Sequence, residues 1–93
     1  MEERMIAVWA ANREKAAALG VRMRPVNPED AMKTARRVLT GSRCSDGFGE
    51  LAELGRLELS LEALAVDRRF TGLFTDEEAN TALTRLLEAG YKF

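Results

Sequence analysis

Residues that begin and end helices divide the chain into helix-favouring segments, and this division limits the fold more than any other feature. Glycines follow successive segments at Gly20, Gly41, Gly55 and Gly90, and glycine is the residue that most often ends a helix. No two runs with the alternating pattern of strands flank one of these segments. The pattern therefore predicts an all-α fold in which residues 1–93 form a single helical domain of about five helices, three long and two short.

Two of the long helices are expected in the first half of the chain. Residues 2–19 are rich in alanine, glutamate, lysine and arginine, which favour helices. A second helix is expected from an N-cap at Asn27 to about Thr40, because Pro28 and two acidic residues follow the asparagine. In the segment between these helices, residues 21–26, Pro25 limits the structure to an edge strand or a minor extended connector, and the connector is the favoured interpretation.

The last long helix has the clearest start signal in the chain. Thr75 and Glu78 have the spacing of a capping box, which predicts a helix over residues 76–89 with Gly90 after its end. The residues expected to face the core are Ala79, Ala82, Leu83, Leu86 and Leu87.

The two short helices are expected between the second and the last long helix. Ser45 or Asp46 is placed to cap a helix that ends at Leu54, and Ser60 to cap a helix over residues 61–66. Residues 57–59 are expected to be briefly extended. Residues 67–74 are interpreted as a turn that packs onto the core, because three of the last five residues of this turn are large and apolar.

Composition excludes several classes of protein. The longest uncharged run, residues 5–12, has eight residues, against the roughly 20 that a membrane span requires. The start of the chain lacks the basic and apolar regions of a secretory signal, and one cysteine cannot form an internal disulfide. We therefore expect a cytoplasmic protein without a membrane partner.

The sequence offers few groups for catalysis or metal binding. It has no histidine, and its only cysteine, Cys44, cannot form a structural zinc site alone. Arg43 and a following helix N-terminus could lower the pKa of Cys44, but no candidate base accompanies the thiol. We expect a non-enzymatic protein with no catalytic residue, no metal site and no cofactor.

Charge is unevenly distributed along the chain. Residues 1–44 contain nine basic and five acidic side chains, whereas residues 45–93 contain five basic and ten acidic ones. Solvated faces without a binding role would also explain this split. The candidate binding residues form a basic set and an acidic set. The basic set is Arg22, Arg24, Lys33, Arg36, Arg37 and Arg43, and the acidic set is Glu50, Glu53, Glu58 and Glu62.

The leading functional hypothesis is a protein–protein interaction module that uses one of these charged faces. A small bacterial or phage accessory protein, such as an inhibitor of a larger complex that handles nucleic acid, would fit the size and charge. A homodimer with an apolar interface that includes Phe70, Phe74 and Tyr91 is another possibility.

A DNA-binding regulator is the alternative. Residues 59–65, followed by residues 82–91, resemble the helix-turn-helix part of winged-helix regulators, in which a short capped helix precedes a recognition helix. The resemblance covers about a third of the chain and implies DNA binding by the last helix. The sequence departs from that family's pattern in the long segment 66–74 and in the acidic start of the last helix, residues 76–78.

Overall fold

The computed structural model describes residues 1–91 and confirms the all-α fold. Three long and two short α-helices follow one another, with two short 3-10 turns between them, and no strand occurs in the described part of the chain. The elements are α1 (Glu2–Ala18), α2 (Ala31–Thr40), α3 (Phe48–Leu54), η1 (Leu57–Leu59), α4 (Leu61–Ala65), η2 (Thr71–Leu73) and α5 (Asp76–Glu88).

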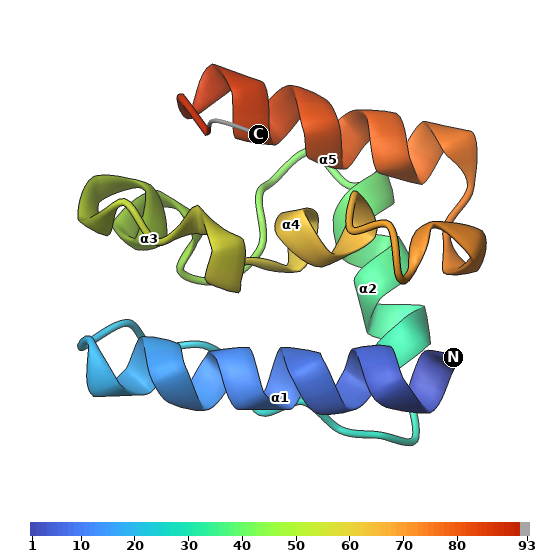
Figure 1. The fold of residues 1–93 in the computed structure, drawn as a ribbon, viewed down its shortest axis with the longest axis horizontal. Helices are drawn as coiled ribbons and strands as arrows, with labels where there is room; N and C mark the ends of the chain where they lie inside the picture. Colours follow the sequence, from blue (N-terminus) through green and yellow to red (C-terminus); the bar gives the residue numbers. More distant parts are fainter. Residues whose placement is uncertain (92–93) are drawn as a thin grey trace.

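The helices surround the short central helix α4. In Figure 1, α1 and α5 form opposite sides of the molecule, α4 lies between them, and α2 crosses behind. Helix α5 packs against α2 and α4, and α1 packs against α2, α4 and η1. A helix as short as α4 has little stability alone, so its burial by its neighbours holds it in place.

The core consists of two adjoining groups of apolar side chains. One lies between α1, α2, α4 and α5 and includes Met5, Leu39 and Phe70, and the other lies around η1 and α3 and includes Leu51 and Leu86. Phe70 is fully buried, which agrees with the expectation that its turn packs onto the core. Because Phe70 and Phe74 are both core residues, they are not available for the apolar dimer interface considered above.

Local sequence signals explain the two ends of α5. The Thr75 hydroxyl accepts a hydrogen bond from the Glu78 amide at 3.1 Å, and the Glu78 carboxylate accepts one from the Thr75 amide at 2.8 Å. At the other end, Gly90 has a φ of 84°, and the Tyr91 amide donates to the Leu86 carbonyl at 2.9 Å. Both helix ends are as predicted, and the hydrogen bonds that form them join residues near one another in the sequence.

Three predictions about local structure are wrong. Helix α3 begins at Phe48 after Gly47, so neither Ser45 nor Asp46 caps it; the Ser45 side chain bonds to Glu62 and the Asp46 side chain to Arg24 instead. Helix α2 begins at Ala31 rather than directly after Asn27. The Asn27 side chain accepts a hydrogen bond from the Glu29 amide at 3.1 Å, but residues 28–30 form a turn before the helix starts. Residues 57–59 form the 3-10 turn η1 rather than an extended segment, and this turn buries Leu57 and Leu59. The connector interpretation of residues 21–26 holds, because they form no strand.

The inward face of α5 is narrower than predicted. Ala82 and Leu86 are buried, but Leu83 is 37% exposed and Leu87 is 56% exposed, so the prediction that these two leucines face the core is wrong. The physical reason is that α5 lies at the outside of the molecule (Figure 1), where α2 and α4 cover only one side of it. Among residues 1–91, no helix combines the length and hydropathy needed to span a membrane.

Candidate functional site

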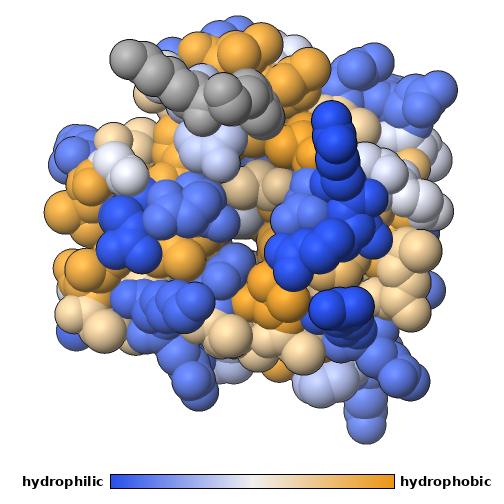
Figure 2. Space-filling model, in the orientation of Figure 1, coloured by the Kyte–Doolittle hydropathy of each residue, from blue (hydrophilic) through white to orange (hydrophobic). Residues whose placement is uncertain are grey.

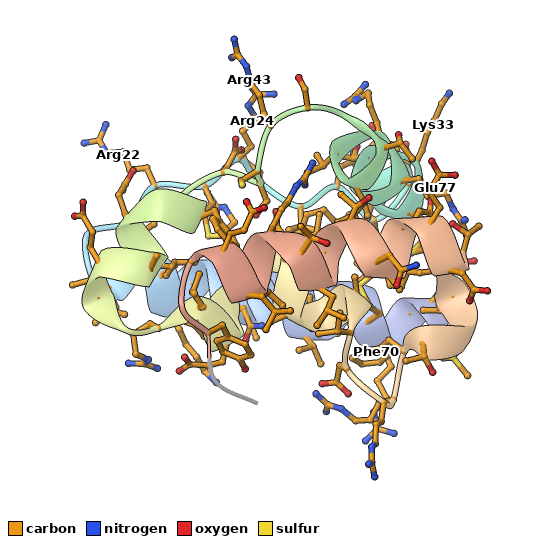
Figure 3. The ribbon with its side chains drawn as sticks, turned by 90° about the horizontal axis from the view of Figure 1, so that it is seen from above. Arg22, Arg24, Lys33, Arg43, Phe70 and Glu77 are labelled. Carbon is orange, nitrogen blue, oxygen red and sulfur yellow. The ribbon has the colours of Figure 1, made fainter. Side chains whose placement is uncertain are left out.

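Most of the basic set lies on one side of the molecule. Figure 3 shows Arg22, Arg24, Lys33 and Arg43 pointing to the side of the α2 helix, while Phe70 lies on the opposite side. Figure 2 shows the side of the molecule that faces away from α2, where charged and apolar side chains are mixed over α1, α4 and α5. We call the side with Arg22, Arg24, Lys33, Arg37 and Arg43 the basic face.

Two members of the basic set have partners within the fold. Arg36 donates hydrogen bonds to the Glu78 carboxylate at 3.4 Å and to the Leu73 carbonyl at 2.9 Å, so it joins α2 to the start of α5. The Arg24 guanidinium lies 3.6 Å from the Asp46 carboxylate. The other four members of the basic set form no ion pair within residues 1–91. They are Arg22, Lys33, Arg37 and Arg43.

A pocket of about 150 Å³ opens within the basic face. Its walls are residues 23–27, helix α2 and the loop 44–46, and the buried side chains Trp9 and Leu61 close its inner end. Arg24 and Arg37 both line it, so the cations and the pocket belong to one surface.

The wall formed by residues 23–27 is held by contacts from α1 and from the loop that precedes α3. Arg13 of α1 donates a hydrogen bond to the Met23 carbonyl at 3.0 Å, and the Arg24 amide donates one to the Asp46 carboxylate at 3.2 Å. Gly47 approaches so closely that a Cβ atom there would lie 2.5 Å from Cγ1 of Val21. The pocket is therefore formed before any ligand binds.

The loop wall is held by a buried ion pair. Glu62 of α4 is fully buried and lies 3.2 Å from the Arg85 guanidinium of α5. The Glu62 carboxylate also accepts hydrogen bonds from the amide and the hydroxyl of Ser45. Arg85 donates further hydrogen bonds to the carbonyls of Val38 at 3.2 Å and Gly41 at 2.8 Å, which satisfies backbone groups at the end of α2. The ion pair thereby sets the path of the loop that carries Arg43.

The part that Arg85 and Ser45 play in this network was not predicted from the sequence. A signal was present, because Glu62 is the only charged residue in the apolar segment 59–66. A lone charge in such a segment indicates a buried group that needs a partner. The sequence does not indicate which of the chain's arginines provides it.

One member of the acidic set does not lie on the surface. Glu62 is in the interior, which corrects its placement on an acidic face. Glu50 and Glu53 are exposed on α3, and Glu58 is exposed on η1, where it accepts a hydrogen bond from Arg56 at 2.6 Å.

Cys44 lines the pocket, and its surroundings act against reactivity. Partial burial is the main reason that the pKa of the Cys44 thiol is raised, and the nearby Glu62 carboxylate raises it further. The lowering that Arg43 and a following helix N-terminus could produce therefore does not occur. Arg85 opposes the shift but does not cancel it.

We expect Cys44 to react slowly with iodoacetamide at neutral pH. Because the thiolate is the reacting form, a raised pKa lowers the reactive fraction at pH 7–8 and moves the increase in rate to higher pH. The measurement is the alkylation rate against pH for the folded protein and for the protein unfolded in urea. A folded protein that reaches its full rate at lower pH than the unfolded one would contradict this prediction.

The α4 and α5 helices differ from a helix-turn-helix unit in two respects. Residues 66–75, which include η2, separate them, whereas a helix-turn-helix turn has about 3–4 residues. The first turn of α5 carries Asp76 and Glu77 on the surface, which would meet phosphates if this helix entered a DNA groove.

No cluster of side chains suited to bind a metal ion occurs among residues 1–91. No protein-family model matches the chain, and neither a curated protein nor a solved structure shows significant similarity to it.

Proposed function

We propose that this protein is a non-enzymatic interaction module that binds an acidic segment of a partner protein through the basic face. One observation carries the proposal. Four cations that form no ion pair among residues 1–91 lie on the side of the molecule that holds a pocket with its walls already in place, and one of the four, Arg37, lines that pocket; the four are Arg22, Lys33, Arg37 and Arg43. Arg36 and Arg85, by contrast, have intramolecular partners and stabilise the fold.

The distribution of charge favours a protein partner over nucleic acid. Acidic side chains lie among the cations, because Asp30 and Asp46 also line the pocket and Glu29 is exposed beside Asp30. A phosphate backbone carries uniform negative charge and would meet these carboxylates as well as the arginines. A peptide can place its acidic residues beside the cations and neutral residues beside Asp30.

DNA binding is the second candidate function, because the same exposed arginines could contact phosphates. It predicts an affinity for duplex DNA that falls steeply as salt rises. Micromolar or tighter binding to a mixed-sequence duplex, together with weaker binding to acidic peptides, would favour this candidate.

The basic face is tested by reversing three of its unpaired charges, Lys33→Glu, Arg37→Glu and Arg43→Glu, in one variant. We expect this variant to bind a fluorescent acidic peptide at least tenfold more weakly than the unaltered protein at about 0.1 M salt, because attraction at each site becomes repulsion. Fluorescence anisotropy measures the affinity, and circular dichroism checks that the variant retains its helices.

A matched control reverses cations outside the basic face. Arg4, Lys15 and Arg68 are exposed and form no ion pair within the described residues, so reversing all three to glutamate changes the net charge by the same amount as the test variant. We expect this control to change the affinity less than threefold. Equal losses in both variants would show that binding depends on net charge alone and would contradict the proposal.

A further inference from the structure

The pocket in the basic face is large enough for one side chain. Its volume of about 150 Å³ is close to that of an apolar protein cavity known to accept benzene. Trp9 and Leu61, at its inner end, are both buried. Val26 and Val38 add apolar surface along its walls.

The rim of the pocket is polar and carries both charges. Arg37 projects from α2 and has no ion-pair partner among the described residues, and Thr34 lies one turn before it. Across the opening, the Asp46 carboxylate forms an ion pair with the Arg24 guanidinium. Arg37 is therefore the rim cation available to a ligand. Arg43 precedes the rim residue Cys44 and is exposed.

We propose that the pocket receives one aromatic side chain of an acidic partner segment, whose flanking carboxylates bind Arg37 and Arg43. This inference rests on the proposed function and specifies the partner as an acidic peptide segment with an aromatic anchor. Burial of the ring supplies apolar contact, and the two arginines select carboxylates beside it. Side chains of this kind dominate binding where a preformed pocket encloses them.

Two matched peptides test the inference. Both are short and acidic, and they differ only in a central residue, which is phenylalanine in one and alanine in the other. We expect the phenylalanine peptide to bind about 10- to 100-fold more tightly, which corresponds to burial of a phenyl group. Trp9 is the only tryptophan and lines the pocket, so its fluorescence is expected to change with the phenylalanine peptide alone.

Filling the pocket from within the protein should remove this preference. In Thr34→Phe the new ring occupies the pocket, and we expect the two peptides to bind with equal affinity. The matched control is Thr84→Phe, the same substitution at an exposed position of α5 away from the pocket, which should keep the preference.

Chemical modification is a second way to fill the pocket, and it needs no substitution in a helix. Cys44 is the only cysteine, is exposed and lines the pocket. Modification with a benzyl maleimide should abolish the preference for phenylalanine, whereas the small methylthio group should retain most of it.

The outcomes separate this inference from the proposed function. Equal binding of both peptides to the unaltered protein overturns the aromatic anchor and leaves the basic face as a peptide-binding surface. Failure of both peptides to bind overturns the proposed function. A single-stranded oligonucleotide that binds more tightly than the phenylalanine peptide, and loses this advantage in Thr34→Phe, assigns the pocket to a nucleobase and also overturns the inference.

Discussion

Replacing Arg85 with leucine is expected to lower the free energy of unfolding by about 3–5 kcal/mol. The reason is the buried position of its partner, because Glu62 is fully buried and the Arg85 side chain is only 10% exposed. Without Arg85 the Glu62 carboxylate keeps the hydrogen bonds from Ser45 but has no counter-charge. A domain of this size is usually stable by only about 5–15 kcal/mol, so the loss is a large fraction of the total.

Urea unfolding of a small set of variants tests this prediction. Arg56→Leu is the control, because Arg56 forms an ion pair with Glu58 in which both side chains are more than 40% exposed, and such pairs contribute about 0–1 kcal/mol. The double variant Glu62→Leu with Arg85→Leu is expected to be more stable than Arg85→Leu, because no unpaired charge remains inside. Equal stability of Arg85→Leu and Arg56→Leu would show that Glu62 does not depend on Arg85.

Replacing Phe70 with alanine is expected to lower the free energy of unfolding by about 3–5 kcal/mol. Phe70 lies between α4 and α5, outside any regular helix, yet it is fully buried in the group that contains Met5, Leu39 and Leu61. Removal of the ring leaves a cavity between four helices that cannot all move inward to fill it.

The matched control for Phe70→Ala is Leu87→Ala, a large-to-small change in α5. Leu87 is 56% exposed, so we expect a change within about 0.5 kcal/mol. Both variants are measured by urea unfolding, with the slope of the transition compared to confirm that the same amount of surface unfolds. A Leu87→Ala variant less stable than Phe70→Ala would reverse the assignment of core and surface along α5.

The parts of the fold that the sequence predicts well are those decided by neighbouring residues. The capping box of Thr75 and Glu78 and the end of α5 at Gly90 involve hydrogen bonds between residues at most five positions apart. Asn27 shows the limit of this approach. Its side chain can cap a helix or close a turn, and the structure contains the turn.

The candidate site could be predicted only in part. Arg24, Lys33, Arg37 and Arg43 were identified as basic residues near one another in sequence, and the structure places them on one face. Arg36 has the same charge and lies beside Arg37, but one position along a helix turns it toward Glu78 and α5. The pocket was not predicted, because its lining comes from α1, α2, α4 and two loops.

Local sequence patterns were enough to predict the helical class of this protein, the order of its helices and the ends of α5, because capping and periodicity act over a few neighbouring residues. The burial of Glu62, the exposure of Leu87 and the pocket lined by Arg24 and Arg37 become visible only in the folded molecule. These features depend on which helix faces cover one another. That packing depends on contacts between residues far apart in the chain, so it cannot be predicted from a short segment of sequence.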